Sequence, residues 1–545
     1  MRVTILGGGG FRVPLIVRQL AASGLPVTGA SLYDTDPGRL AVMAGVLAGD
    51  RQAGGLPVTI AGSLAQAVRG ADIIFAALRP GGLDGRVSDE RSALAAGVLG
   101  QETVGAGGLA SAARTVPVAD AIARRVAELA PDAWLISMTN PAGIVTEVMA
   151  AVLGPRVIGV CDSPVGLVRR ACAACGIDPG PSLGTVTDRV DADYLGINHL
   201  GWLRGLRAAG AGGVGGAGVA GASGAGGAGR VAGAGRASGV SGGPGAGGAG
   251  GVGGAGGVGG VGGAGGVGGD DGAGGAGRVA GVAGAGVADG ADLLPGLLAE
   301  PGRLLLTEEG RLFGPDVLRS LGSIPNEYLY WYYAGAEALR DVLAAGRTRG
   351  EHVRDRQQEF YSAAAAALSA TGPGPGAAAR LWQRANDERN RSYFAELRAG
   401  EQAGERDEAD LAAGGYESVA VALAAALAGG PAAQLILNVP NQGTVPALPP
   451  GLVLEVPCRV DAAGAVPLPV PAPTAHQLGL MSVVRSCERD IADAALLAAR
   501  PAGPHDAARA QALALRAFAT HPLVGSLGAA RLLAAAALGP ASHHT

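Results

Sequence analysis

The sequence predicts an α/β protein that begins with a parallel sheet and continues into a mixed α+β region. Three observations lead to this prediction. Short apolar runs alternate with helical stretches over residues 1–160, four glycines follow the first apolar run, and an aspartate ends the second. Strands that alternate with helices form parallel sheets with both faces covered. We therefore expect a Rossmann-like nucleotide-binding domain, with an architecture like that of lactate and malate dehydrogenases.

The elements of the amino-terminal region follow from these patterns. We expect strands at 2–7, 29–34, 71–78, 133–139 and 156–160. We expect helices at 11–23, 37–50, 118–130 and 142–153. Farther along, alanine-rich helical stretches dominate, and strand-like pieces occur at 433–440 and 451–460. These features predict a domain over 1–190 and a second, mixed domain over 191–545.

A low-complexity segment interrupts the second domain. From about residue 208 to about 290 the chain is almost only Gly, Ala and Val, with a few Ser and Arg. Such a composition cannot bury enough apolar surface to offset the entropy of ordering its backbone. We interpret it as a disordered insertion in a surface loop.

Charge and cysteine content exclude several classes of protein. The chain has 42 Lys+Arg and 46 Asp+Glu, so its net charge of −4 gives no basis for binding nucleic acid or an anionic membrane. No signal peptide or transmembrane helix is apparent. Five cysteines are too few and too scattered for a disulfide framework, which favours the cytoplasm. The single CxxC of Cys172 and Cys175 is weak evidence for zinc or redox chemistry.

The glycine cluster Gly7, Gly8, Gly9 and Gly10 lies between a predicted strand and a predicted helix. A helix amino terminus at such a turn can receive a pyrophosphate. The third glycine of the usual GxGxxG pattern is replaced by Arg12, so the match is loose. Asp34 ends the second strand, where a carboxylate accepts hydrogen bonds from the ribose hydroxyls of NAD. We therefore predict NAD as a cofactor held by these glycines and Asp34.

Polar residues follow several strands, at the edge of the sheet where ligands bind in open α/β folds. Cys161 and His199 are a suitable ligand pair for a divalent transition metal. From spacing alone, a buried core thiol is the favoured explanation of Cys161, and a loop histidine with satisfied hydrogen bonds is that of His199. By itself, the run "YLYWYY" (328–333) also favours an aromatic core stripe over a functional cluster.

In combination, these stretches resemble family 4 of the glycoside hydrolases, the NAD- and metal-dependent 6-phospho-glycosidases. The matching stretches, from residue 1 to about 538 apart from the insertion, are "ILGGGG…P", "LYDTD", "RPGGLDGR..DE", "GLASAARTVPV", "TNPAG", "GVCDSP", "GINHLGW", "PNEYLYWYY", "VPNQGTVPALPPGLVLEVPC" and "THPLVGS". The pattern as a whole is most similar to the 6-phospho-β-glucosidase branch.

The resemblance implies roles for particular residues. Cys161 and His199 would hold the metal, usually manganese, and Tyr328 would be the catalytic base. Asp162 matches a position that is an acid in some members and Asn in others. The substrate-binding candidates are Arg79, Asn140 and Arg349, and we add Arg86 for pairing with phosphate.

The resemblance also implies a mechanism. NAD oxidises C3 of the sugar, the metal polarises the ketone, and the base removes the C2 proton so that the aglycone leaves; water then adds and NADH reduces the ketone. The expected substrate is a phosphorylated disaccharide or glucoside, and the expected assembly is a homodimer or homotetramer.

Three other functions stay open from the sequence. The first is a 6-phospho-α-glucosidase or α-galactosidase of the same family, because Asp162 is also found in α-acting members. The second is an NAD-dependent hydroxy-acid dehydrogenase, in which "CDSP" and "GINHLGW" would have no role. The third is a non-catalytic NAD-binding sensor.

Overall fold

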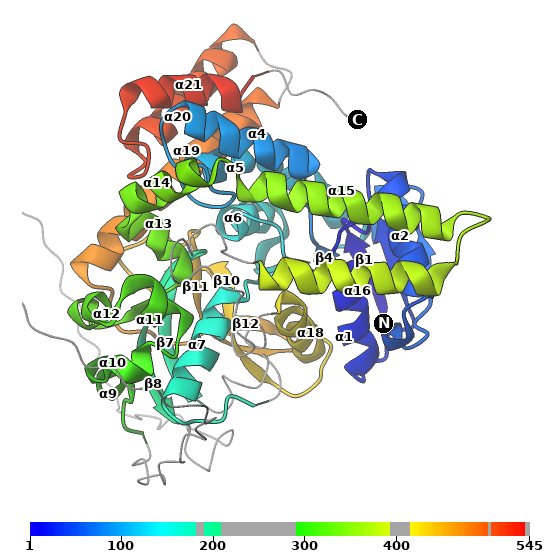
Figure 1. Ribbon diagram of the computed structural model, residues 1–545, viewed down its shortest axis with the longest axis horizontal. Helices are drawn as coiled ribbons and strands as arrows, with labels where there is room; N and C mark the ends of the chain where they lie inside the picture. The colour runs from blue at the N-terminus through cyan, green and yellow to red at the C-terminus, as the bar shows by residue number, and fades with distance from the viewer. Residues whose placement is uncertain (181–189, 209–289, 393–414, 500–502, 540–545) are drawn as a thin grey trace, which may run out of the picture. The chain divides into compact units, whose positions relative to one another are not determined.

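A single sheet runs through the part of the chain that the computed structural model describes, residues 1–180, 190–208, 290–392, 415–499 and 503–539 (Figure 1). Its strand order is β3-β2-β1-β4-β5-β6-β10-β11-β7-β8-β9, and β12 pairs with β11. The segment that we predicted to be disordered lies outside the described residues. No helix of the described chain is long and apolar enough to cross a membrane.

The amino-terminal half of the sheet is parallel. Its strands are β1 (Arg2–Leu6), β2 (Gly29–Tyr33), β3 (Val58–Ile60), β4 (Ile73–Ala76), β5 (Trp134–Ser137) and β6 (Val157–Gly159). The order 3-2-1-4-5-6 is that of a Rossmann dinucleotide-binding domain, which confirms the predicted fold class. The central strands β4, β5 and β6 are fully buried because helices cover both faces, whereas β3 at the edge of the sheet is partly exposed.

The carboxyl-terminal half of the sheet is antiparallel. Its strands are β7 (Val190–Ile197), β8 (Leu200–Ala208), β9 (Ile324–Pro325), β10 (Ala433–Pro440), β11 (Val453–Asp461) and β12 (Gly464–Pro467). β10 and β11 form an eight-residue ladder from Ala433↔Val460 to Pro440↔Val453. Together with the parallel half they share one hydrophobic core.

Helices of the amino-terminal half connect successive strands. They are α1 (Val13–Ala22), α2 (Pro37–Ala48), α3 (Leu64–Val68), α4 (Gly82–Ala95), α5 (Gly105–Leu129), α6 (Ala142–Leu153) and α7 (Ser163–Ala174), with short 3-10 turns η1 (Arg51–Ala53) and η2 (Gly154–Arg156). α6 packs against β6, β10 and β11, so it spans the boundary between the two halves of the sheet.

Helices of the second half come from several separate segments. Short elements follow β8: α9 (Leu294–Ala299), α10 (Pro301–Leu304), α11 (Glu308–Phe313), α12 (Pro315–Leu321), η3 (Glu327–Leu329), α13 (Tyr330–Tyr333) and α14 (Gly335–Ala345). Longer ones are α15 (Arg349–Leu368), α16 (Pro375–Arg391), α18 (Tyr416–Leu427), α19 (Ala475–Ala498), α20 (Pro504–Thr520) and α21 (Leu527–Ala537). In Figure 1, α15 and α16 lie side by side and extend from the second half to α2 of the first, which both helices contact.

Most predicted elements are present within one or two residues of the expected bounds. The helix expected at 118–130 is longer, because it begins at Gly105 and includes the small residues of "GAGGLASAA". The polar residues 78–90 directly follow β4, and from Gly82 onward they form the first part of α4. The division into domains at residue 190 stays a prediction.

The two halves of the sheet meet through β10 and β11. Gly159 of β6 pairs with Asn438 of β10, and Glu455 of β11 pairs with Gly196 of β7. A Cβ atom at Gly159 would lie 2.3 Å from Oγ1 of Thr146 in α6 and 2.8 Å from Cβ of Asn438. Glycine is therefore required where α6 and β10 approach the end of β6.

We predict that Gly159→Ala destabilises the protein by about 1–3 kcal/mol, because the added methyl group overpacks this junction. As a matched control, Gly479→Ala adds a methyl group on an exposed position of α19 where nothing lies within 4 Å. We expect that control to stabilise the protein by about 0.5–1 kcal/mol. Urea denaturation measures both, and shifts of the same sign would contradict the prediction.

Candidate active site

The glycine cluster forms a tight loop between β1 and α1. Gly7 has a φ of +84°, and a Cβ there would lie 2.3 Å from the Ala77 carbonyl oxygen. A Cβ at Gly8 would lie 2.8 Å from Cβ of Leu32. The Gly10 amide donates to the Gly7 carbonyl at 2.8 Å, which closes the turn. The loop therefore holds its backbone at the helix amino terminus, as a pyrophosphate site requires.

Asp34 lies directly beside this loop. Its Oδ2 accepts a hydrogen bond from the Gly9 amide at 2.9 Å, and its Oδ1 accepts from the Asp36 amide at 3.0 Å. The carboxylate thus links the end of β2 to the glycine loop. This placement is the one expected of an acceptor for ribose hydroxyls in this fold.

Two aromatic residues from the second half also bond the loop, and neither was predicted from the sequence. Tyr361 of α15 donates from its hydroxyl to the Gly9 carbonyl at 2.7 Å. Trp382 of α16 donates from Nε1 to the Phe11 carbonyl at 2.9 Å. The α15–α16 pair therefore packs over the nucleotide loop.

Cys161 lies just after β6, and α7 begins two residues later at Ser163. Its side chain is buried, and Sγ lies 3.6 Å from the hydroxyl of Tyr416 in α18. Burial raises the pKa of the Cys161 thiol well above its usual value, and the carboxylates of Glu455 and Asp162 add to this effect. Without a cation beside it, this thiol would remain protonated.

His199 lies in the turn between β7 and β8. It has a φ of +63° and is only 1% exposed, and neither ring nitrogen has a hydrogen-bond partner in the described structure. The ring stacks on Tyr328 of η3, with centroids 3.9 Å apart and planes 14° apart. Burial lowers the pKa of His199 to about 3, so the imidazole is neutral and can act as a ligand.

These contacts connect four side chains from distant segments. Cys161 contacts Tyr416, and Tyr328 stacks on His199. Tyr328 is also close enough to Tyr416 to raise its pKa, although burial is the main cause of that rise. Tyr416 was not predicted from the sequence. Asn140 adds a buried Oδ1 without a hydrogen-bond partner in the described residues.

This donor set fits a divalent metal. A thiol, a neutral imidazole and an unpaired amide oxygen are suitable ligands or neighbours for such an ion. A buried imidazole with two unpaired nitrogens is costly unless a ligand pairs with it. Among the described residues, no group of three or more His, Cys, Asp and Glu side chains is arranged to hold a metal by itself. A metal here would therefore depend on other oxygens to complete its coordination.

Arg79 and Arg86 share one carboxylate, Glu102. Arg86 also bonds Glu90 at 2.7 Å, and its Nη1 bonds Glu102 at 2.6 Å; Arg79 pairs with the other Glu102 oxygen. Burial opposes ionisation of Glu102, yet these two guanidinium groups hold its pKa at about 2. The Arg79 side chain is 43% exposed and Arg86 is 11% exposed, so Arg79 is the more accessible to a ligand.

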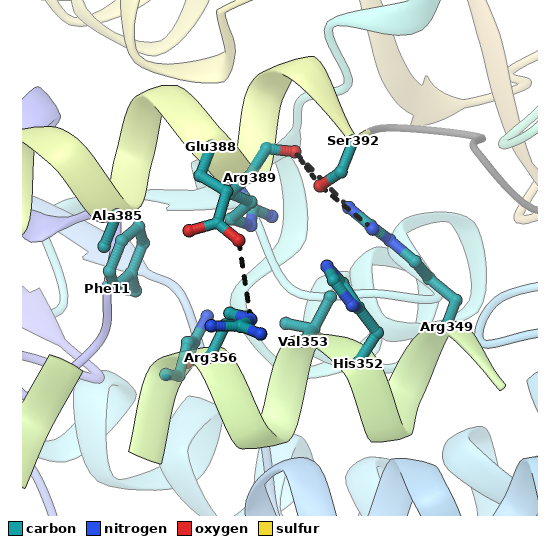
Figure 2. Close-up of a pocket in the computed structure, with 10 residues that line it drawn as sticks. Phe11, Arg349, His352, Val353, Arg356, Ala385, Glu388, Arg389 and Ser392 are labelled. Carbon is teal, nitrogen blue, oxygen red and sulfur yellow. Dashed lines mark hydrogen bonds and ion pairs between the residues drawn. The ribbon is translucent and has the colours of Figure 1, made fainter. Parts of the chain in front are cut away.

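A pocket rich in arginine lies between α15 and α16 (Figure 2). Arg349 reaches across from the start of α15 and donates to Oγ of Ser392 at 3.1 Å and to the Arg389 carbonyl at 3.3 Å. Burial lowers the pKa of Arg389 to about 9, and the nearby Arg12 and Arg349 add to this effect. A cluster with this excess of positive charge favours an anionic ligand. Arg389 was not predicted from the sequence.

Asp162 and Arg12 complete the arrangement of predicted residues. Asp162 precedes α7 and adds its charge to those around Cys161 and Tyr416. Arg12, at the third glycine position, pairs with Glu417 at 3.4 Å and lies 4.8 Å over the ring of Tyr416. The replacement of glycine by arginine therefore links the nucleotide loop to α18.

The fold and these residues define a class of protein, a dinucleotide-binding α/β fold with a buried thiol, imidazole and phenol that come from separate segments of the chain. Comparison with known proteins gives the family. The pattern of family 4 glycosyl hydrolases matches residues 2–176, and that of the family 4 carboxyl-terminal domain matches residues 285–524. The chain therefore belongs to family 4 of the glycosyl hydrolases.

Individual relatives are similar over part or all of the chain. A probable 6-phospho-beta-glucosidase of Bacillus subtilis is 34% identical over 207 residues, which is 37% of this chain and 45% of the relative. The chain thus aligns with less than half of that relative's length. A 6-phospho-beta glucosidase of Thermotoga maritima, solved with NAD and glucose-6-phosphate, has a TM-score of 0.65 at 20% identity over 98% of both chains. A 6-phospho-alpha-glucosidase from gut microorganisms, solved with NAD and Mn²⁺, has a TM-score of 0.65 at 19% identity over 98% of this chain and 97% of its own.

Glu327, the residue before Tyr328, belongs to a buried cluster of charged side chains. Arg170 of α7 forms a bidentate pair with Glu309, and its Nη2 lies 3.8 Å from Oε2 of Glu327. Burial raises the pKa of Glu327 to about 7, against the attraction of Arg170. A carboxyl whose pKa is raised by folding favours the folded state while protonated, so its contribution is lost as pH rises from about 4.5 through 7.

We therefore predict that Glu327→Gln stabilises the protein at pH 8 by about 1–3 kcal/mol and has a smaller effect at pH 5. Urea denaturation at pH 5, 6, 7 and 8 measures the difference. Glu359→Gln, an exposed carboxylate on α15, is the control and is expected to show no such dependence. A difference that is constant across this range would contradict the raised pKa.

Proposed function

We propose that the protein hydrolyses the O-glycosidic bond of 6-phospho-β-glucosides. The reaction would use NAD and a divalent metal, for which manganese is the first candidate. The observation that carries this proposal is the neutral, buried imidazole of His199, which stacks on Tyr328 and has no hydrogen-bond partner among the residues that the structure describes. Membership of family 4 supports it, as does the 34% identity to a probable 6-phospho-beta-glucosidase.

The NAD site in this proposal is the glycine loop. The backbone of Gly7–Gly10 would receive the pyrophosphate, and Asp34 would accept hydrogen bonds from ribose hydroxyls. The close approach of the Ala77 carbonyl to Gly7 supports this assignment, because only glycine leaves the backbone accessible there. The solved Thermotoga maritima and gut-microorganism relatives both contain NAD.

The metal site in this proposal consists of Cys161 and His199. The thiol would lose its proton to the metal, since burial otherwise keeps it neutral. When bound, NAD⁺ supplies a hydride acceptor for C3 of the sugar, and the metal supplies a Lewis acid that acidifies the C2 proton.

The residues of the chain would then carry out the proton transfers. Tyr328, stacked on His199 and 9% exposed, would remove the C2 proton beside the metal ligand. Asp162 would protonate the departing aglycone oxygen, and Asn140 would orient a sugar hydroxyl with its unpaired Oδ1. The near-complete burial of Cys161 and His199 excludes bulk water from the reacting atoms.

Arginine would select the phosphorylated sugar. Arg79 is partly exposed, and Arg349 lies beside Arg389 in the pocket between α15 and α16. A phosphate dianion would balance charge that Glu102 alone does not neutralise. Arg86 stays a weaker candidate for phosphate binding, because Glu90 and Glu102 already bond its guanidinium group.

The α-anomer is the second candidate substrate. The observation in its favour is Asp162 within "CDSP", together with the overall similarity to a 6-phospho-alpha-glucosidase. A cytoplasmic location and a homodimer or homotetramer complete the proposal; the free thiols of all five cysteines support a reducing compartment.

We predict that Cys161→Ala lowers hydrolysis of a chromogenic 6-phospho-β-glucoside by at least about 10³-fold, measured with NAD and Mn²⁺, because it removes a metal ligand. Chelation of the metal should have the same effect. Cys172→Ala is the control. It removes a different fully buried thiol, which lies in α7, and should retain activity. Hydrolysis by Cys161→Ala at the wild-type rate would exclude the metal role.

We also predict a redox-neutral reaction that prefers the β-anomer with its 6-phosphate. A panel of α- and β-glucosides and galactosides, phosphorylated or not, would be assayed for aglycone release and for absorbance of NADH. Release without net NADH is the expected result. Accumulation of NADH in proportion to product would indicate a dehydrogenase, and NAD binding without turnover of any substrate would indicate a sensor.

A further inference from the structure

A row of polar residues crosses the sheet where its parallel and antiparallel halves meet. Ser137 of β5 pairs with Gly159 of β6, Gly159 with Asn438 of β10, Asn438 with Glu455 of β11, and Glu455 with Gly196 of β7. Residues in register on neighbouring strands place their side chains on the same face. The row therefore lies on the face that α6 covers, where Thr146 meets Gly159.

Glu455 is the centre of this row. Its Oε1 accepts hydrogen bonds from Nδ2 of Asn438 at 3.0 Å and from Nδ2 of Asn198 at 3.3 Å. Its Oε2 accepts from the Tyr194 hydroxyl at 3.1 Å. The side chain is 0% exposed, and the described residues provide no ion-pair partner for it. A carboxyl group is costly to bury with only neutral donors, so its presence here calls for a specific role.

Asn198 connects this carboxyl to the candidate metal site. It immediately precedes His199, and its Oδ1 accepts a hydrogen bond from the Ala142 amide at 3.0 Å. Ala142 begins α6, two residues after Asn140. One amide side chain therefore joins Glu455 to the two turns that carry His199 and Asn140.

The turn at His199 needs such an anchor. A φ of +63° is unfavourable for a residue with a Cβ and persists only where the surroundings impose it. In the described part of the chain the ring stacks on Tyr328 and neither nitrogen has a hydrogen-bond partner, so no hydrogen bond to the ring fixes its orientation. Its orientation therefore depends on the backbone of the turn, and the side-chain bonds of Asn198 hold that backbone on both sides.

We propose that Glu455 is a positioning residue, which holds His199 in its metal-binding orientation through Asn198. This inference rests on the proposed function, because it assumes that His199 binds the metal. Residues that orient metal ligands through hydrogen bonds typically change metal affinity by about 10- to 100-fold when they are removed.

The test uses Co²⁺ as a probe of the full-length protein, without substrate. Cobalt bound to a thiolate gives a charge-transfer absorption band, so a titration reports both affinity and ligation by Cys161. Asn198→Ala removes the link to the turn and leaves the bonds of Glu455 to Asn438 and Tyr194. Glu455→Leu removes both acceptors, while Glu455→Gln keeps one oxygen for the two asparagines.

We expect Asn198→Ala and Glu455→Leu to weaken Co²⁺ binding by about 10- to 100-fold, and Glu455→Gln to restore it to within about threefold of wild type. Glu147→Gln is the matched control, because Glu147 also bonds β11, at the Val453 amide (3.0 Å), without any link to His199. It should leave Co²⁺ affinity unchanged. If Glu455→Leu does not fold, Asn198→Ala decides the question.

Two results would overturn the inference in distinguishable ways. Folded Asn198→Ala with wild-type Co²⁺ affinity and band intensity would refute the positioning role alone. A wild-type protein without the cobalt–thiolate band would refute the proposed metal site, and the positioning role with it.

Discussion

The junction between the parallel and antiparallel halves of the sheet is the constraint on which the rest of the structure depends. A parallel sheet ends at β6, and the antiparallel strands continue it only if β10 approaches β6 closely. Gly159 allows that approach, because any side chain there would collide with Thr146 and Asn438. The segments after β5, β6 and β7 carry Asn140, Cys161 and His199, and the turn after β7 is joined to the segment after β5 by the bond from the Ala142 amide to Asn198 Oδ1 at 3.0 Å.

Burial near this junction determines the protonation states of His199 and Cys161. It keeps the imidazole of His199 neutral and the thiol of Cys161 protonated until a cation is present. The same low polarity would strengthen the electrostatic effect of a metal ion bound there. Arg79, with its side chain 43% exposed, lies in more accessible surroundings, where its charge can attract an anionic group.

The α15–α16 pair contacts both the glycine loop and the arginine pocket. Tyr361 of α15 and Trp382 of α16 donate hydrogen bonds to the glycine loop. Arg349 at the start of α15 and Arg389 near the end of α16 line the pocket in Figure 2. A nucleotide at the loop and an anion in the pocket would therefore contact the same two helices. This pair of helices therefore provides a common support for the glycine loop and the arginine pocket.

The sequence by itself determined the Rossmann-like half, because alternation of strands and helices, the glycine turn and Asp34 are local patterns. It also identified the polar stretches with Cys161 and His199, but spacing left each with a structural explanation. Tertiary structure alone decided that Tyr416 and Glu455 lie near Cys161 and that Arg389 joins Arg349 in the pocket, since these residues come from strands and helices far along the chain. Their roles depend on which side chains meet after β10 inserts next to β6, and long-range pairing of this kind leaves no periodic signal in the sequence.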